Sequence, residues 1–332
     1  MLDLKGKTLL ITGGTGSLGK ALTKHILNEF PHIRRLIIFS RDEHKQNSMS
    51  QDYPAEKFPQ IRFVIGDVRD KEHLIMTFRG VDYVIHAAAM KHVHIAENNP
   101  DECIKTNVGG AQNVISASMA TNVKRVVALS TDKACRPVST YGASKMISDK
   151  LFISANSLEN LHETKFSAVR YGNVIGSVGS VVPYFKKLAK TSKVLPITNA
   201  EMSRFNITHQ KGVDLIMFAL ENAWGGELFV PKCSSYRVLD LKEAICSKCE
   251  IRIIGERPGE KTFEEMITND DADFTFDLGK YYVILPKNPN WEVKNYIEKL
   301  NASKVPNDFS YNSKDNDHWE TVESLRMLIK HE

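Results

Sequence analysis

Short hydrophobic runs alternate with longer amphipathic stretches through the first half of the chain. The runs are rich in Val, Ile and Leu and are bounded by polar or glycine-containing segments, a pattern typical of buried strands. Strands are therefore predicted at residues 7–12, 35–40, 61–66, 83–88, 125–130 and 166–171. Helices are predicted between them, among them 17–29, 100–121 and 141–157.

This alternation of strand and helix predicts an α/β fold, in which a doubly wound parallel sheet is covered by helices on both faces. Asn99 and Pro100 form a plausible cap and first-turn pair for the second of these helices. Ser139 or Thr140 can cap the third. The helix boundaries therefore carry local signals of their own.

The pattern is less regular beyond about residue 175. Segments 193–198, 226–231 and 251–261 indicate shorter strands and loops. Residues 176–332 are therefore expected to form a smaller mixed α/β region around the carboxyl edge of the sheet, with 1–175 as the main domain. The tail at 307–332 is polar and then amphipathic, which predicts a docking loop followed by a terminal helix.

Composition narrows the classes of protein to consider. Hydrophobic residues make up 42% and charged residues 25%, ordinary values for a globular protein. The formal charge of +4 is small and spread along the chain, so nucleic-acid binding is not expected, although a cationic pocket for an anionic metabolite is. The N-terminus lacks a signal-peptide pattern and no apolar run reaches the ~20 residues of a membrane span, so we expect a cytoplasmic protein without membrane association.

The five cysteines suit a reducing compartment better than a disulfide framework. Cys246 and Cys249 form a C-x-x-C, but zinc needs four ligands and no second pair exists. His92 and His94 lack carboxylate partners. No metal site is predicted, and the C-x-x-C is interpreted as two small residues near a helix end.

A glycine-rich turn follows the first strand and opens the first helix. Gly13, Gly16 and Gly19 give T-G-x-x-G-x-x-G. Glycine permits the tight turn, the approach of the backbone to a pyrophosphate and close packing of helix on strand. The helix N-terminus then offers free amides and a positive dipole end to the phosphates. The turn predicts a Rossmann dinucleotide site.

The end of the second strand should meet the adenosine ribose. An acidic residue there would bind the ribose hydroxyls of NAD, whereas Arg41 can pair with a 2′-phosphate, with Ser40 and Lys45 as further donors. NADP is therefore favoured over NAD. The alternative is that Arg41 and Lys45 are solvated and Asp42 binds the ribose. Asp67 and its neighbour Val68 should meet the adenine, and three small residues should allow close approach of the cofactor, namely Ala87, Ala88 and Ala89.

Tyr141 and Lys145 form Y-x-x-x-K, which on a helix places both side chains on one face. A phenol with a pKa near 10 is a poor base at neutral pH. A nearby ammonium, with the positive charge of an oxidised nicotinamide, should lower that pKa. Ser130 or Thr131, at the end of the preceding strand, can add a hydroxyl to the same substrate oxygen.

Together these motifs resemble the extended short-chain dehydrogenase/reductase family and, within it, the 5-inverting UDP-N-acetylglucosamine 4,6-dehydratases of pseudaminic acid synthesis. The resemblance extends over essentially the whole chain. It is carried by ITGGTGSLGK, FSRDEHKQ, GDVRD, HAAAMKHVHIAENNPDECIKTNVGGAQNVI, LSTDKA, YGASK, VRYGNVIGSVGSVVPYF, IIGERPGEK and YNSKDNDHW.

The resemblance implies an NADP-dependent lyase acting on UDP-N-acetylglucosamine. Tyr141 would take the proton of the 4-hydroxyl during oxidation at C4, water would be eliminated across C5–C6, and hydride would return to C6. The product would be UDP-2-acetamido-2,6-dideoxy-L-arabino-hex-4-ulose. A homo-oligomer, a hexamer as in related enzymes, is also implied.

Asp132 and Lys133 stand where retaining 4,6-dehydratases carry an Asp-Glu pair. The resemblance therefore assigns Asp132 as the acid for the 6-hydroxyl and Lys133 as the C5 base. Such a base needs a lowered pKa, expected from burial, neighbouring Lys145 and the cofactor cation. Exchange of the two roles, or a dual role for Tyr141, remains open.

The substrate pyrophosphate needs cations, and Arg204 and Arg257 are the candidates because an arginine fork suits phosphate oxygens. Glu260 could accept a ribose hydroxyl, Asn173 resembles a family residue at a substrate phosphate, and Lys91 is expected near the sugar or the nicotinamide ribose. The predicted substrate-binding residues are Lys91, Tyr171, Asn173, Arg204, Arg257 and Glu260.

The predicted catalytic residues are Thr131, Asp132, Lys133, Tyr141 and Lys145. The predicted cofactor-binding residues are Gly13, Thr15, Gly16, Ser17, Leu18, Gly19, Ser40, Arg41, Lys45, Asp67, Val68, Ala87, Ala88, Ala89, Lys91, Thr106, Tyr141 and Lys145. Three other functions stay open. A UDP-sugar C4-epimerase would have no need of Asp132 and Lys133, a C5-retaining dehydratase would keep the configuration, and an NADP-bound regulatory subunit would not turn over.

Overall fold

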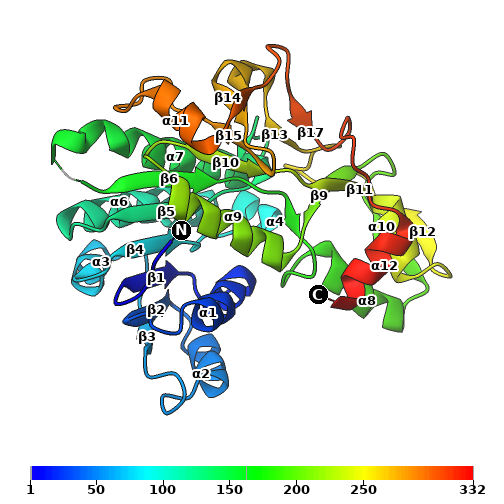
Figure 1. The fold of residues 1–332 in the computed structure, drawn as a ribbon. Coiled ribbons are helices and arrows are strands. Elements are labelled where there is room, and N and C mark those ends of the chain that lie inside the picture. The colour runs from blue at the N-terminus through cyan, green and yellow to red at the C-terminus, as the bar shows by residue number, and fades with distance from the viewer. Residues whose placement is uncertain (1, 162, 332) are drawn as a thin grey trace.

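A ten-stranded sheet forms the centre of the protein in the computed structural model, which describes residues 2–161 and 163–331 (Figure 1). The strand order is β16-β14-β15-β10-β6-β5-β4-β1-β2-β3. The seven strands from β3 to β10 are parallel, and β15, β14 and β16 extend the sheet in antiparallel pairing. Their bounds are β1 Thr8–Thr12, β2 Arg35–Ser40, β3 Ile61–Ile65, β4 Tyr83–His86, β5 Arg125–Leu129, β6 Lys165–Val169, β10 Leu228–Pro231, β14 Thr275–Asp277, β15 Tyr281–Ile284 and β16 Ser303–Lys304.

Helices cover both faces of this sheet, because alternate strand residues point to opposite sides. Leu9 and Ile11 of β1 lie in a core that includes buried residues of α1 and α9, whereas Leu10 lies in a second core with α3, α6 and α7. The bounds of these helices are α1 Ser17–Glu29, α3 Lys71–Phe78, α6 Gly110–Ala120, α7 Thr140–Ala155 and α9 His209–Asn222. The doubly wound parallel sheet is confirmed.

The strands and helices predicted in the first half agree with the structure to within a few residues, apart from the segment 100–121. This segment forms α5 (Pro100–Ile104), a π-helical turn (Lys105–Gly109) and then α6. The predicted side-chain cap by Asn99 is wrong, since its amide donates to the carbonyl of Ile95 at 2.9 Å. Ser139 does cap α7, accepting a hydrogen bond from the amide of Gly142 at 3.1 Å.

The second half of the chain does not form a separate layer. The segment 226–231, expected in the smaller region, contributes β10 to the central sheet beside β6, and α9 packs on the same core as α1. β14, β15 and β16 continue the sheet. The parallel sheet therefore extends past residue 175, and the substrate-facing elements are inserted around it.

The remaining strands form three small sheets. Their orders are β11-β9-β7, β13-β17 and β12-β8. Their bounds are β7 Asn173–Val174, β8 Val194–Ile197, β9 Ser203–Ile207, β11 Ser234–Arg237, β12 Glu250–Ile253, β13 Glu265–Ile267 and β17 Tyr311–Asn312. The other helices are α2 Glu43–Asp52, α4 Val93–Asn98, α8 Val181–Thr191, α10 Val238–Ile245, α11 Val293–Leu300 and α12 Val322–His331.

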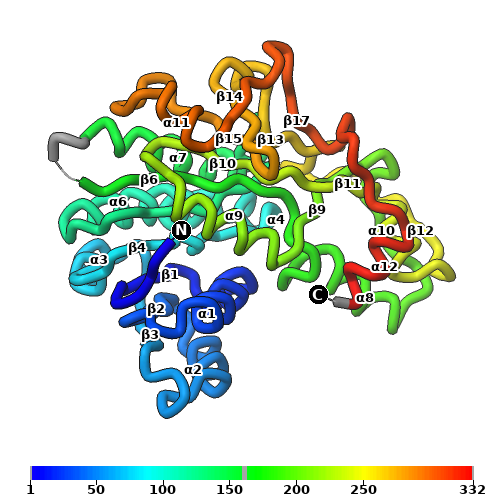
Figure 2. The backbone as a smooth tube through the Cα atoms, in the orientation of Figure 1, coloured from blue at the N-terminus to red at the C-terminus, as the bar shows by residue number. Residues whose placement is uncertain are grey.

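The C-terminal tail docks as predicted. Figure 2 shows the red C-terminal segment running from β17 to α12, which lies beside α8 and α10. Asn316 in this tail donates to the carbonyl of Cys233 at 2.8 Å and to Ser235 Oγ at 2.9 Å. Leu325 and Ile329 of α12 are buried against Leu241 of α10. The tail therefore packs against residues that precede it by more than eighty positions.

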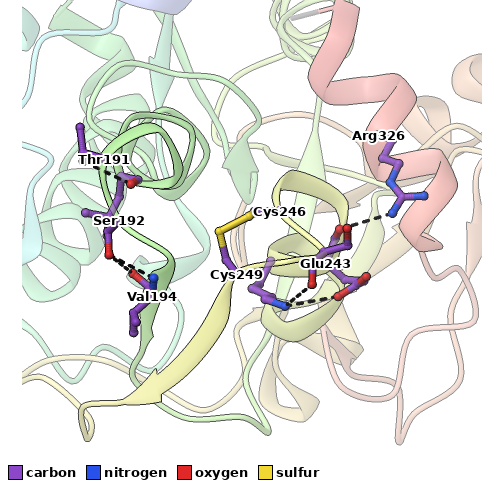
Figure 3. The surroundings of a disulfide bond; sticks show 10 residues. Thr191, Ser192, Val194, Glu243, Cys246, Cys249 and Arg326 are labelled. Atoms are coloured by element: carbon purple, nitrogen blue, oxygen red, sulfur yellow. Dashed lines mark hydrogen bonds and ion pairs between the residues drawn. A yellow bond between two sulfur atoms is a disulfide. The ribbon is translucent and has the colours of Figure 1, made fainter.

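Cys246 and Cys249 form a disulfide where α10 ends, close to the start of β12 (Figure 3). The predicted position near a helix end is confirmed, but the interpretation of the pair as two unlinked residues is wrong. In the described part of the chain, no helix is both long and apolar enough to cross a membrane.

Candidate active site

A cleft of about 770 Å³ opens at the carboxyl ends of the parallel strands. Open α/β sheets bind their ligands at this edge. Most of the residues predicted from the sequence line the cleft, namely Gly13, Thr15, Gly16, Ser17, Leu18, Gly19, Ser40, Arg41, Lys45, Val68, Ala87, Ala88, Ala89, Lys91, Thr106, Thr131, Lys133, Tyr141, Lys145, Tyr171 and Asn173. The remaining ones, which do not line it, are Asp67, Asp132, Arg204, Arg257 and Glu260.

The glycine turn has the shape that a pyrophosphate requires. Helix α1 begins at Ser17 directly after Gly16, which has no side chain to occupy the helix N-terminus. Gly13 has a φ of +67°, and a Cβ there would lie 2.8 Å from the backbone nitrogen of Ala88. A Cβ on Gly19 would lie 2.4 Å from the carbonyl oxygen of Gly14. These residues fit a dinucleotide, whose phosphates the free amides of α1 would hold.

At the expected ribose position, Arg41 is half exposed and lies 3.4 Å from Asp67 Oδ2. Asp42 caps α2 by accepting from the amide of Lys45 at 2.9 Å, and it pairs with Lys45 Nζ at 3.0 Å. The hydrogen bond from that amide lowers the pKa of Asp42. Arg41 and Asp42 both line the cleft, and the Asp42 carboxylate is engaged in the cap of α2.

Tyr141 and Lys145 both lie on the buried face of α7 and both line the cleft. Burial lowers the pKa of Lys145. Burial raises the pKa of Tyr141 to about 12, although the charge of Lys133 and a hydrogen bond with Thr131 act in the opposite direction. The expected lowering of the Tyr141 pKa is therefore wrong for the polypeptide by itself, because desolvation outweighs the neighbouring charge.

Both strand-end hydroxyls, Ser130 and Thr131, line the cleft. Ser130 donates to Asp149 Oδ2 at 2.6 Å, and Arg170 lies 3.5 Å from the same oxygen. Thr131 instead lies beside Tyr141 and donates to Asp132 Oδ1 at 3.0 Å. The contact with Tyr141 favours Thr131, and the choice between the two hydroxyls stays a prediction.

Asp132 and Lys133 begin a buried chain of charges at the end of β5. Asp132 is fully buried, and its Oδ1 accepts from Lys133 Nζ at 3.0 Å. Among the described residues, Asp132 Oδ2 has no hydrogen-bond partner. Lys133 Nζ also contacts Glu264 Oε1 at 3.2 Å and Asn173 Oδ1 at 3.4 Å. An ammonium is therefore held between two carboxylates beside Tyr141.

These carboxylates decide the protonation of Lys133. Burial alone would lower its pKa, but the negative charges of Asp132 and Glu264 outweigh burial, and the pKa lies above its ordinary value. The expectation of a lowered pKa is wrong, because Glu264 and Asp132 are closer partners than Lys145. Lys133 is a cation at neutral pH.

The predicted substrate residues fall into two groups. Lys91, Tyr171 and Asn173 line the cleft, whereas Arg204 is directed inward, donating to the carbonyl of Ser203 at 2.7 Å and approaching Glu264 at 3.9 Å. Arg257 and Glu260 lie on the loop after β12 and approach each other at 4.0 Å. Binding of substrate by Arg204, Arg257 and Glu260 stays a prediction.

A short segment that the sequence analysis did not single out crosses the cleft beside the glycine turn. Residues 177–180 line the cleft. The amide of Val178 donates to Ser17 Oγ at 3.2 Å, and its carbonyl accepts from Lys91 Nζ at 2.6 Å. Lys91 is therefore tied to this segment, and burial lowers the pKa of its ammonium. The two positive-φ glycines in this region, Gly176 and Gly179, could have marked the turn in the sequence.

Residues 9–286 match the model of a family described as "Polysaccharide biosynthesis protein". The match covers most of the chain. The chain belongs to this family.

Two relatives of this family member are curated enzymes. A protein of Campylobacter jejuni named "UDP-N-acetylglucosamine 4,6-dehydratase (inverting)" is 48% identical and covers 98% of each chain. A protein of Rickettsia canadensis named "UDP-glucose 4-epimerase" is 43% identical and covers 84% of this chain and 82% of its own. The structure of Pen from Bacillus thuringiensis superposes with a TM-score of 0.90 at 35% identity, covering 99% of each chain. The fold and the family are therefore shown.

Glu264 is the main residue of the site that the sequence did not indicate. It follows a stretch with no strand or helix signal and precedes β13 by one residue. Its sequence neighbour Glu265 has the same chemistry but pairs with Arg136, at 3.6 Å. Nothing in the sequence separates the two carboxylates, so only the folded chain identifies the one that reaches Lys133.

Proposed function

We propose that this chain is a UDP-N-acetylglucosamine 4,6-dehydratase that inverts C5 and eliminates water from the sugar. The observation that carries the proposal is the buried group of Asp132, Lys133 and Tyr141 at one strand end of the cofactor cleft. Oxidation at C4 needs only a base such as Tyr141, whereas elimination needs proton transfer at two further positions. The 48% identity to the inverting dehydratase of Campylobacter jejuni supports the same activity.

In this mechanism Tyr141 accepts the proton of the 4-hydroxyl, and Thr131 orients the same oxygen. A nicotinamide cofactor held at the glycine turn would supply reversible hydride transfer for the oxidation at C4 and the reduction at C6. Lys145, on the same face of α7, adds positive charge near the phenol oxygen once the phenolate forms. The 4-ketone makes the C5 proton acidic, and loss of that proton together with the 6-hydroxyl releases water.

The protonation of Lys133 supports the alternative in which Asp132 and Lys133 exchange the roles of acid and base that the family resemblance assigned to them. A cationic Lys133 already carries the proton that the departing 6-hydroxyl needs. Asp132 has a free buried oxygen, Oδ2, that suits a base for the C5 proton. We therefore propose Lys133 as the acid and Asp132 as the base. Tyr141, protonated in the first step, then returns its proton to the opposite face of C5, which inverts the centre, and the proton on Asp132 passes back to Lys133.

The cofactor is proposed to be NADP. Arg41 at the cleft supports this preference, because its guanidinium can pair with a 2′-phosphate while Asp42 is engaged in the cap of α2. The further proposals are a cytoplasmic homo-oligomer, hexameric as implied by the family resemblance, and a product used for bacterial surface glycans such as pseudaminic acid. Membership of a polysaccharide-biosynthesis family supports the last of these.

We expect Arg41→Ala to weaken NADP binding by about 10- to 100-fold, because a charged hydrogen bond contributes about 1.5–3 kcal/mol. NAD binding should change little, since NAD has no 2′-phosphate. Calorimetric titration of both cofactors measures the effect. Arg62→Ala, on β3 but outside this cleft, is the matched control. Equal weakening of NADP and NAD would contradict the assignment.

A second candidate is a UDP-sugar C4-epimerase, which the 43% identity to the Rickettsia protein favours. Epimerisation would use Tyr141 and Lys145 but would leave the charged pair Asp132–Lys133 without a task. Proton NMR of UDP-N-acetylglucosamine with the purified protein in deuterated water separates the two. A new C6 methyl signal with deuterium at an inverted C5 is expected. A 4-epimer, or no turnover after NADP is added, would exclude the dehydratase, and a methyl signal with C5 retained would exclude inversion alone.

A further inference from the structure

A buried carboxylate outside the proposed acid–base groups contacts one of them. Glu264 is 2% exposed, and its Oε1 lies 3.2 Å from Lys133 Nζ. Arg204 Nε lies 3.9 Å from Oε1, and Lys261 Nζ lies 3.8 Å from Oε2. Among the described residues Oε2 has no hydrogen-bond partner. A buried carboxylate is costly unless paired, so this arrangement depends on the cations around it.

The backbone of Glu264 is fixed by the C-terminal tail. Its amide donates to Ser313 Oγ at 2.9 Å, and its carbonyl accepts from the amide of Ser313 at 2.7 Å. Ser313 is fully buried, and its hydroxyl also lies 2.9 Å from that of Ser203 in β9. The tail therefore sets the position of the Glu264 carboxylate relative to the strand end that carries Lys133.

We propose that Glu264 is a positioning residue, held in place by the C-terminal tail, that fixes the ammonium of Lys133 for proton transfer in the elimination step. This inference rests on the proposed function, since it requires Lys133 to handle a proton during dehydration. In the described part of the chain Glu264 contacts Lys133, which handles a proton in the elimination, and it acts on Tyr141 only through the charge of Lys133.

The charge of Glu264 keeps Lys133 protonated. The titratable and charged groups around this ammonium are Asp132, Glu264, Arg204, Lys261, Tyr141 and Tyr236. Asp132 and Glu264 raise the pKa of Lys133, whereas burial and the charge of Arg204 lower it. Without the Glu264 charge, only Asp132 of these two carboxylates still raises the pKa of Lys133, while burial continues to lower it. The pKa therefore falls, and the ammonium loses its proton at a lower pH.

The test is Glu264→Gln, which keeps the size of the side chain and removes its charge. The alkaline limb of the kcat profile is expected to move to lower pH by about 1 to 3 units, the size typical of losing an opposite charge at this distance. KM for UDP-N-acetylglucosamine should stay within about twofold, and the burst of cofactor reduction in a single turnover should persist. An unchanged alkaline limb would overturn the inference.

Glu265→Gln is the matched control, because this neighbour pairs with Arg136 and makes no recorded contact with Lys133. A wild-type profile is expected for it, and an equal shift would overturn the specific role of Glu264. If Glu264→Gln does not fold, Glu264→Asp is tested instead. An alkaline limb at a pH below that of the wild type but above pH 7 supports the role, and an alkaline limb at the wild-type pH overturns it. Failure of the proposed function is distinguishable, since the wild-type protein would then give no methyl product at all.

Discussion

Tyr141→Phe is expected to lower kcat for dehydration by about 10²- to 10⁴-fold, the usual contribution of a general base. In the proposed mechanism the phenol oxygen accepts the 4-hydroxyl proton, and without it the oxidation at C4 loses its base. Because Tyr141 is 9% exposed and lies on the buried face of α7, the ring of phenylalanine preserves its packing. The loss should therefore appear in chemistry rather than in folding.

The measurement is the burst of reduced cofactor in a single turnover, followed by absorbance, together with methyl product by NMR. Both should disappear together, since C4 oxidation precedes every later step. Tyr184→Phe, on α8 and exposed, is the control and should retain wild-type rates. A variant that still reduces cofactor would show that another group accepts the proton, and Tyr171 is the nearest candidate in the same cleft.

Asp132→Asn should also lower kcat by about 10²- to 10⁴-fold, but at a different step. Asparagine keeps the size of the side chain and an oxygen that can accept from Thr131 and Lys133, yet it cannot take up the C5 proton. We expect cofactor reduction at C4 to continue while elimination stops, so the reduced cofactor and the 4-keto sugar accumulate on the protein.

Deuterium incorporation at C5 distinguishes this outcome from a general loss of activity, because exchange at C5 should fall together with methyl formation. Asp270→Asn is the control, because Asp270 is an exposed carboxylate in the short 3-10 helix Asn269–Phe274 after β13. Loss of C4 oxidation along with elimination would place Asp132 in the first step. Normal turnover would remove it from the mechanism. Unlike Glu264→Gln, the effect should persist over the whole pH range.

The first half of the fold follows from local patterns. Buried parallel strands consist of short Val, Ile and Leu runs, which are visible in the sequence. The turn Gly13–Gly19 requires glycine for steric reasons. Both features could therefore be predicted without tertiary contacts. The position of Tyr141 and Lys145 on one face follows from helical spacing. The segment 100–121 shows the limit of such reasoning, because its π turn has no periodic signal that separates it from an α-helix.

The placement of the second half depended on long-range pairing. The segment 226–231 has the composition of any short strand, and only its pairing with β6 shows that it completes the central sheet. Likewise the direction of Arg204 toward Glu264 is set by β9, β13 and the tail together. Sequence spacing carries no information about such contacts between distant segments.

The sequence by itself determined the six parallel strands of the first half and the edge that carries the glycine turn, and it predicted Asp132, Lys133, Tyr141 and Lys145, because each depends on local spacing or on a strand end. Only the tertiary structure decided their protonation. Burial raises the pKa of Tyr141, and Glu264, brought from 131 positions away by the tail and β13, helps to raise that of Lys133. A pKa is set by desolvation and by charges within a few ångströms, and those are properties of the folded chain.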